Sequence, residues 1–245
     1  MREFGLIGRG IGHSFSAGFF NDKFSREGID ARYISFDLED ISMVTDILAT
    51  HPLIKGFNVT SPYKRDIIPI LHSLSPEARE LNAVNVVKVG RRTDGSPLLE
   101  GHNTDCAGFG LTLPSLLPPA SRALVMGTGG ASSAVTLALR KLGVPYLVVS
   151  RTPEGQEIGY EEMNRLLPGY NLLVNATPLG MHPRIDACPP VDFEAVGSSH
   201  ICYDLIYNPP ESLFLRKASE KGARTVNGLD MLINQANLSW EIWNS

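Results

Sequence analysis

The chain has 245 residues, of which 43% are hydrophobic and 20% are charged, and its formal net charge is -4 at pH 7. This hydrophobic content is sufficient for a packed core, and the length fits one large domain or two small ones. The charges are of mixed sign without a cluster of Lys and Arg, which argues against a nucleic-acid-binding surface. We therefore expect a globular, soluble protein that binds neither nucleic acid nor a membrane.

The start of the chain and its cysteines indicate the compartment. The N-terminus soon becomes strand-like and lacks the apolar core of a signal peptide, and no run reaches the roughly 18 apolar residues of a membrane span. The cysteines Cys106, Cys188 and Cys202 are odd in number and show no Cys-x-x-Cys spacing, which favours neither disulfides nor zinc. We interpret them as small apolar side chains, and we expect a cytoplasmic protein without a metal.

Strand and helix patterns alternate through the first hundred residues, as in an α/β sheet. Apolar runs on either side of the Gly-containing stretch 89–97 indicate a hairpin, so we expect a mixed rather than purely parallel sheet. The predicted strands are residues 4–8, 32–38 and 54–60, and the predicted helices are 16–28 and 41–50.

A second α/β region follows a predicted connecting helix over residues 104–121, which Pro114 ends or bends and the Pro118-Pro119 pair closes. The succession of strand, helix and strand beyond it is a βαβ unit. The predicted strands are 122–127, 146–150, 172–177, 200–207 and 223–228, and the predicted helices are 131–143, 211–222 and 230–243.

A glycine turn joins the first strand and helix of this second region. Backbone N–H groups and a positive helix end make such a turn suited to a pyrophosphate. Gly127 and Gly129 match the first two positions of G-x-G-x-x-G, whereas Ser132 stands at the third. The motif is weak by itself, and the alternative is a tight turn without a ligand.

The end of the next strand distinguishes the two nicotinamide cofactors. An NAD site places Asp or Glu there to hold the ribose 2′-hydroxyl, whereas a 2′-phosphate requires Arg. The strand ends at Ser150, Arg151 and Thr152, which supply a planar cation and two hydroxyls without an acid. This favours NADP; the alternative is a surface arginine.

Lys64 and Asp105 are candidate acid–base residues. Lys64 follows the predicted strand 54–60 after the Ser61-Pro62 break, and Asp105 lies near the start of the predicted connecting helix. An ammonium group can donate a proton to a ketone oxygen and take it back, and a nearby carboxylate can hold it in position. Taken alone, a solvated lysine and a helix-capping aspartate are the alternatives.

Nine segments spread over nearly the whole chain resemble the shikimate dehydrogenase family. They are IGRGIGHSFSAGFFN (7–21), GFNVTSPYK (56–64), LNAVN (81–85), GHNTD (101–105), GTGGAS (127–132), SRT (150–152), NATPLGM (175–181), YDLIYNP (203–209) and NGLDMLINQA (227–236). The resemblance implies an α/β fold of two domains with the active site in the cleft between them. A mixed substrate domain would span 1–104, with the C-terminal helix 230–245 returning to it, and a Rossmann-like NADP domain would span 105–229.

The resemblance also implies the reaction, in which NADPH reduces 3-dehydroshikimate to shikimate for aromatic amino acid biosynthesis. A quinate/shikimate dehydrogenase of broader specificity and a non-catalytic shikimate-binding sensor remain alternatives. The partner would be this small molecule, and the chain would be a monomer or homodimer. The implied catalytic residues are Lys64 and Asp105, and the implied substrate-binding residues are Ser14, Ser16, Thr60, Asn85, Asp105, Tyr207 and Gln235. The implied NADP contacts are Gly127, Thr128, Gly129, Gly130, Ala131, Ser150, Arg151, Thr152, Thr177, Leu205 and Gly228.

The span from Thr152 to Leu172 is shorter than in the family, with room for little more than two helical turns in place of a full helix. Because less protein would cover the adenine side, we expect this chain to bind NADP⁺ more weakly than full-length relatives do. Titration of both proteins in one buffer tests this expectation, and equal dissociation constants would contradict it.

Overall fold

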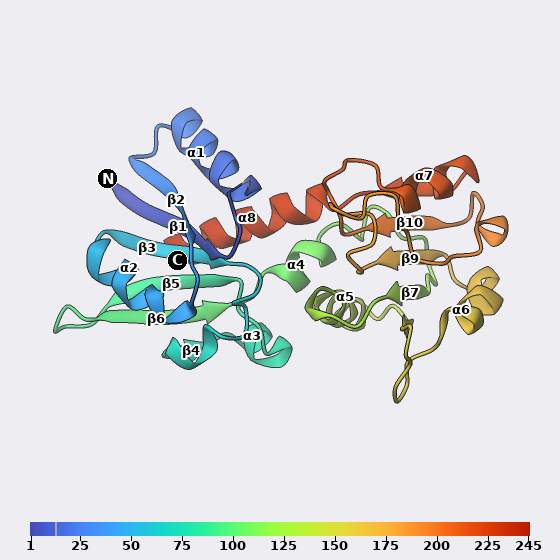
Figure 1. Cartoon of the computed structure of the whole chain (residues 1–245), viewed down its shortest axis with the longest axis horizontal. Coiled ribbons are helices and arrows are strands. Elements are labelled where there is room, and N and C mark those ends of the chain that lie inside the picture. The colour runs from blue at the N-terminus through green and yellow to red at the C-terminus, as the bar shows by residue number, and fades with distance from the viewer. Residues whose placement is uncertain (13) are drawn as a thin grey trace. The chain divides into compact units, whose positions relative to one another are not determined.

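The computed structural model describes residues 1–12 and 14–245, which divide into two compact units (Figure 1). The first unit comprises Met1–Thr104 and Ala236–Ser245, and the second comprises Asp105–Gln235. Each unit contains one sheet covered by helices, which confirms the predicted α/β class. None of the helices in the described ranges is long and apolar enough to cross a membrane.

The first unit is built on a six-stranded sheet with the order β2-β1-β3-β5-β6-β4. β1 is parallel to β2 and β3, whereas β5 is antiparallel to both β3 and β6, so the predicted hairpin and mixed sheet are confirmed. The strands are β1 (Arg2–Gly8), β2 (Ala31–Asp37), β3 (Ile54–Val59), β4 (Ser73–Leu74), β5 (Val86–Arg91) and β6 (Pro97–His102), and the helices are α1 (Phe15–Glu27), α2 (Val44–Thr50), α3 (Pro76–Leu81) and the last part of α8 (Leu229–Asn244). Neither β4 nor α3 was predicted from the sequence.

Alternation along the strands divides the core of this unit into two layers. Phe4 on β1 faces α1 and α8, and its ring centroid lies 4.9 Å from that of Trp243. Ile7 on the same strand faces the opposite side, where it joins the cluster that includes α2. The indole Nε1 of Trp243 donates to the carbonyl of Val87 at 3.1 Å, which attaches the end of α8 to the sheet.

The second unit is built on a five-stranded parallel sheet with the order β11-β10-β9-β7-β8. The strands are β7 (Ala123–Met126), β8 (Tyr146–Val149), β9 (Leu172–Asn175), β10 (Ile201–Asp204) and β11 (Arg224–Val226). The helices are α4 (Asp105–Gly110), α5 (Gly130–Lys141), α6 (Tyr160–Leu166), α7 (Leu213–Glu220) and the first part of α8.

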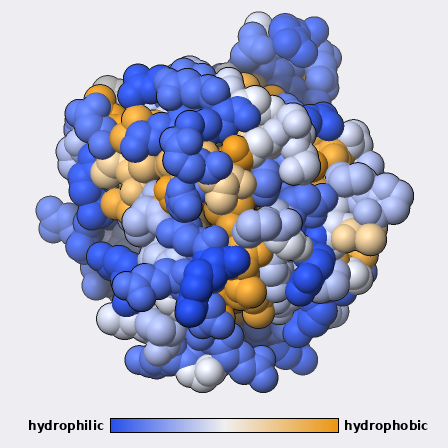
Figure 2. Space-filling model, turned by 90° about the vertical axis from the view of Figure 1, so that its right-hand side faces the viewer, coloured by the Kyte–Doolittle hydropathy of each residue, from blue (hydrophilic) through white to orange (hydrophobic). Residues whose placement is uncertain are grey.

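Helices cover both faces of this sheet. The chain moves outward from β7 to β8 and then back across to β9, so right-handed crossovers place α5 and α6 on opposite faces. Met163 of α6 and Phe214 of α7 are buried in one core cluster with strand residues such as Leu173. Figure 2 shows the side of the molecule that carries α6 and α7, where the surface is mostly hydrophilic and the exposed hydrophobic residues form small patches.

The predicted connecting helix over residues 104–121 is wrong in its length, because α4 ends at Gly110 and residues 111–121 form turns. Two glycines in α4 lower its helix propensity. Pro114 has no N–H and disfavours helical backbone at Leu113. The hydroxyl of Thr112 donates to the carbonyl of Phe109 at 2.7 Å and satisfies one group at the helix end.

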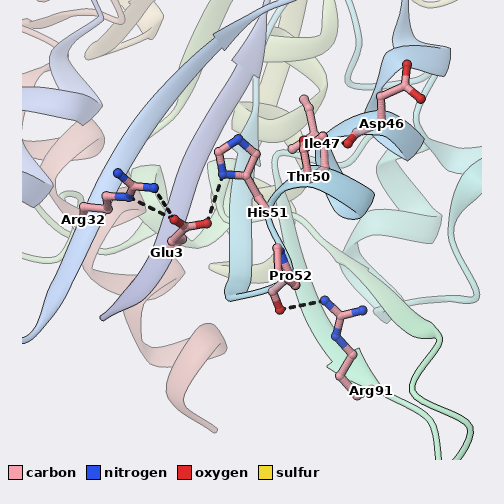
Figure 3. A network of polar contacts seen from close by, with 8 residues as sticks. All are labelled: Glu3, Arg32, Asp46, Ile47, Thr50, His51, Pro52 and Arg91. Carbon is pink, nitrogen blue, oxygen red and sulfur yellow. Dashed lines mark hydrogen bonds and ion pairs between the residues drawn. The ribbon is translucent and has the colours of Figure 1, made fainter.

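A buried carboxylate joins β1, β2 and the segment after α2 (Figure 3). Glu3 is 6% exposed; its Oε1 accepts from Arg32 Nε at 3.0 Å, and its Oε2 lies 3.0 Å from His51 Nδ1. Burial raises the pKa of Glu3, but hydrogen bonds and charges from Arg32 and His51 lower it more, so the pKa lies below its usual value. The cluster therefore stabilises the amino ends of the two parallel strands as long as Glu3 is ionised.

Glu3→Gln should lower the free energy of unfolding at neutral pH by about 1–3 kcal/mol, because it removes a buried, hydrogen-bonded charge. The pKa of Glu3 is lower in the folded state than in the unfolded state. Its contribution to the free energy of unfolding is therefore complete above a pH of about 4.5, and it is lost as the pH falls through the folded-state pKa. Urea unfolding from neutral pH to below the folded-state pKa should show the two proteins converging in acid. Glu27→Gln, at the exposed Lys23–Glu27 pair, is the matched control and should change stability by less than about 0.5 kcal/mol. A constant difference across this pH range would contradict the assignment.

Candidate active site

A cavity of about 290 Å³ lies in the second unit at the carboxyl ends of β7, β8 and β9. β7 stands between the other two strands, and the chain order reverses at this point of the sheet. Ligands of open α/β sheets bind at such a reversal. The predicted cofactor residues that line the cavity are Gly127, Thr128, Gly129, Ser150, Arg151, Thr152 and Thr177.

The glycine turn after β7 brings the backbone close to this cavity. Gly127 has φ +112°, and a Cβ atom there would lie 3.0 Å from the carbonyl oxygen of Ala176. The positive φ favours glycine, and the approach to Ala176 leaves little room for a side chain. Gly129 precedes α5 without a side-chain cap, so N–H groups of the first helical turn can bind an anion. Ser132, at the third fingerprint position, is small and 3% exposed within α5.

The chain after β8 folds back on the strand before α6 begins. Ser150 N donates to the carbonyl of Ile158 and Ile158 N donates to that of Val148, both at 2.9 Å. Tyr160, the first residue of α6, thereby lines the cavity beside Ser150 and Arg151. Burial raises the pKa of the Tyr160 phenol, against a smaller lowering by the charge of Arg151, so the hydroxyl keeps its proton at neutral pH.

The loop after β9 rests on a buried polar network. Asn175 Nδ2 donates to Asp204 Oδ1 at 3.1 Å, and Asn175 Oδ1 accepts from the amide of Thr177 at 3.0 Å and from its hydroxyl at 2.7 Å. Burial raises the pKa of Asp204, while hydrogen bonds from Ser212, the Ile206 amide and Asn175 lower it, and the net effect is upward. The network holds Thr177 in one position at the cavity wall.

Four predicted cofactor residues lie outside the cavity lining as far as the described residues show. Gly130 and Ala131 belong to the first turn of α5. Leu205 and Gly228 lie against each other after β10 and β11, since a Cβ atom at Gly228 would be 2.0 Å from the carbonyl oxygen of Leu205. Only glycine permits this approach of the two segments.

In the first unit, Asn85 connects the start of β5 with the segment after β6. Its Oδ1 accepts from the amide of Thr104 at 2.8 Å, and its Nδ2 donates to the Thr104 hydroxyl at 3.1 Å. Asn85 is 5% exposed, so these bonds satisfy much of a buried amide. The segment that carries Thr104 is thus held beside β5.

A second polar network joins β2, β3 and α8. Tyr33 Oη donates to Asn58 Oδ1 at 2.8 Å, and Asn58 Nδ2 donates to Ser239 Oγ at 2.9 Å and to the carbonyl of Asn85 at 3.2 Å. Burial raises the pKa of Tyr33 well above its usual value, against the lowering effect of a hydrogen bond with Ser16. Ser16 of the predicted substrate set is therefore joined through Tyr33 and Asn58 to Asn85 of the same set.

The other predicted substrate residues of this unit lie on the segments that follow β1 and β3. Ser14 is the N-cap of α1, and its Oγ accepts from the amide of Ser16 at 3.2 Å. The amide of Thr60 donates to the carbonyl of Ile7 at 2.9 Å. β1 and β3 are parallel, so Thr60 lies at the edge of the sheet from which the chain leaves β1 toward Ser14.

The remaining predicted residues are divided between the units. The carbonyl of Lys64 accepts from the amide of Val84 at 2.7 Å in the first unit. In the second unit, Asp105 is 7% exposed at the start of α4, and Tyr207 is 38% exposed after β10. Gln235 lies on α8 close to α4, where a Cβ atom at Gly108 would be 2.7 Å from its Cγ.

Several residues of these sites were not found from the sequence. Asn58 lies inside the quoted motif GFNVTSPYK, which was a usable signal. Tyr33, Ser239, Tyr160 and Arg184 lie on segments whose local pattern gives no indication of a site, and the last two enter the cavity only through the folding of the chain.

The chain is similar to known proteins over nearly its whole length. Residues 6–87 match the family model described as the shikimate dehydrogenase substrate binding domain. The shikimate dehydrogenase (NADP(+)) of Carboxydothermus hydrogenoformans is 35% identical over 98% of this chain and 90% of its own length. The crystal structure of shikimate dehydrogenase from Aquifex aeolicus matches with a TM-score of 0.87 and 32% identity, over 100% of this chain and 92% of that one.

The shikimate 5-dehydrogenase of Thermus thermophilus, solved in complex with NADP(H) and shikimate, has a TM-score of 0.85 and 30% identity, over 99% of this chain and 93% of that one. Similarity of this extent covers both units, including the sheet whose strand ends form the cavity. The chain therefore belongs to the shikimate dehydrogenase family.

Proposed function

We propose that this protein is an NADP-dependent shikimate dehydrogenase, which reversibly reduces 3-dehydroshikimate to shikimate in the synthesis of aromatic amino acids. The observation that carries the proposal is the glycine-turn cavity with Arg151 at the end of β8, in a chain that aligns over its whole length with NADP-dependent members of the family. The enzyme acts on a CH–OH group and takes NADP as its cofactor.

The cavity suits the nucleotide part of NADP. Gly127, Thr128 and Gly129 offer backbone N–H groups for a diphosphate, and the Arg151 guanidinium suits the 2′-phosphate. The residues that line the cavity include no Asp or Glu in the described part of the chain, so no carboxylate of the cavity wall faces that phosphate. The bound nicotinamide would supply the hydride. Leu205 and Gly228, whose backbones touch, are assigned to its side of the site by the family motifs.

The first unit is proposed to bind the substrate. Ser14, Ser16, Thr60 and Asn85 present hydroxyl and amide groups, which pair with the carboxylate and hydroxyls of a small polyol acid. Tyr207 and Gln235 are assigned to the same site from the second unit by their motifs. The networks through Asn58 and Asn85 support the assignment, because they hold these segments in fixed positions.

Lys64 is the proposed proton donor, and Asp105 holds its ammonium group. During reduction Lys64 Nζ gives a proton to the ketone oxygen as the carbon gains hydride, and during oxidation it takes the proton back. A chain of hydrogen bonds between the two segments supports the pairing. Val84 N donates to the carbonyl of Lys64, the next residue is Asn85, and Asn85 binds Thr104, whose chain neighbour is Asp105.

The first test of the function is the absorbance of reduced nicotinamide with shikimate and NADP⁺, repeated with NAD⁺ and with quinate. A rise only with shikimate and NADP⁺ supports the proposal. A rise with quinate as well would indicate a dehydrogenase of broader specificity. No rise with any pair, together with measurable shikimate binding, would indicate a non-catalytic sensor.

Lys64→Ala should lower kcat by about 10²–10⁴-fold, the usual share of a positioned acid–base group, while shikimate still binds with nearly the same dissociation constant. Steady-state kinetics and calorimetric titration measure the two effects. Lys55→Ala, which removes an exposed lysine from β3, is the matched control. Turnover near that of the control would rule out Lys64 as the proton donor.

Arg151→Ala should raise the dissociation constant of NADP⁺ about tenfold or more and leave that of NAD⁺ nearly unchanged, because a charge-assisted contact to the 2′-phosphate is lost. Arg165→Ala removes an exposed charge from α6 outside the cavity lining and serves as control. If both nucleotides lost affinity equally, Arg151 would not be the residue that distinguishes them.

A further inference from the structure

Arg184 is a second cation in the cofactor cavity, contributed by a segment outside all nine family-like motifs. It lies in the loop after β9, whereas Arg151 follows β8, so the two arginines enter the cavity from different segments. Within residues 1–12 and 14–245, the Arg184 guanidinium forms no ion pair or side-chain hydrogen bond. An exposed arginine without a protein partner is available to an anionic ligand.

The backbone of this loop is nevertheless well anchored. Gly180 N donates to the carbonyl of Arg184 at 3.1 Å, Arg184 N donates to that of Met181 at 2.8 Å, and Ala187 N donates to that of Arg184 at 3.2 Å. These bonds close a compact turn at the residue itself. The backbone of Arg184 is thus fixed at the cavity wall. Less conformational entropy is therefore lost when its side chain binds an anionic ligand.

The charges around Arg151 explain why a second cation matters. The short segment after it carries Glu154 and Glu157, and α6 adds Glu161 and Glu162. A phosphate monoester brings a further charge of about -1.5 to -2. A single exposed ion pair contributes little, and the carboxylates nearby oppose it. The diphosphate is different, because the backbone N–H groups of the glycine turn face it without any side-chain charge.

We propose that Arg184 binds the 2′-phosphate of NADP together with Arg151, so that two guanidinium groups from the β8 and β9 loops hold it between them. Arg184 is thus a further determinant of NADP over NAD. This inference rests on the proposed function, since it assigns one more residue to the same cofactor cavity. Planar guanidinium groups donate several hydrogen bonds to one phosphate, and two of them also offset its full charge.

The test uses the full-length protein and isothermal titration with four nucleotides: NADP⁺, NAD⁺, adenosine 2′,5′-bisphosphate and adenosine 5′-monophosphate. Arg184→Ala should weaken the binding of NADP⁺ and the bisphosphate about tenfold, and that of NAD⁺ and the monophosphate less than about twofold. Arg184→Lys should recover part of the loss. Rising salt should weaken NADP⁺ binding less steeply in Arg184→Ala than in the unsubstituted protein.

Arg216→Ala removes an exposed arginine from α7, outside the cavity lining, and should bind all four nucleotides as the unsubstituted protein does. An equal loss for NADP⁺ and NAD⁺ in Arg184→Ala would place Arg184 at the diphosphate and overturn the inference. Unchanged affinities, or the same loss in Arg216→Ala, would overturn it as well. If the unsubstituted protein bound no NADP⁺, the proposed function itself would be wrong, whereas normal binding that Arg184→Ala leaves intact would refute only this inference.

Discussion

Parallel hydrogen bonding of β7 to both β8 and β9 is the constraint on which the cofactor cavity depends. Because the three strands run in one direction, the glycine turn, Arg151 and Thr177 all come to the same edge of the sheet. The turn after β7 passes close to Ala176, and the positive φ of its first residue favours glycine there. A side chain at Gly127 would move the β9 loop and, with it, part of the cavity wall.

The first unit holds its candidate site in another way, through side-chain amides. Asn58 joins β2, β3 and α8, and Asn85 joins β5 to the segment that leads into α4. These segments are far apart in the sequence, so the buried amides act as fixed links between them. Satisfied buried polar groups of this kind favour one arrangement over its alternatives. The same network therefore positions Ser16 and Asn85, while the Glu3 cluster stabilises the strands at their opposite ends.

The segment after β8 forms part of the walls of the cavity. The chain returns to the strand at Ile158 and immediately begins α6, so the ring of Tyr160 stands at the cavity wall. The segment that makes this return is acidic, which is unfavourable for a bound phosphate. An arginine from the β9 loop offsets that charge without lengthening the segment. Cofactor preference in this chain is then a balance of charges contributed by several loops rather than a property of the β8 end alone.

Local patterns in the sequence were sufficient to predict most strands, the α/β class, the mixed first sheet and the glycine turn. Hydrophobic periodicity and turn residues indicate these elements, because both can be recognised within about ten neighbouring residues. They also overestimated the helix after residue 104, because its apolar spacing continues past the point where glycine and proline end it.

Local patterns did not predict the hydrogen-bond partners of Asn58. They also did not predict that Tyr160 and Arg184 line the cavity. Each depends on segments that meet only when the sheets form: Ser239 lies 181 positions from Asn58, and Arg184 follows a different strand from Arg151. Such contacts leave no periodic trace in the chain. The residue types of the motifs can thus be recognised in the local sequence. The residues that surround them in space are determined by the packing of distant segments.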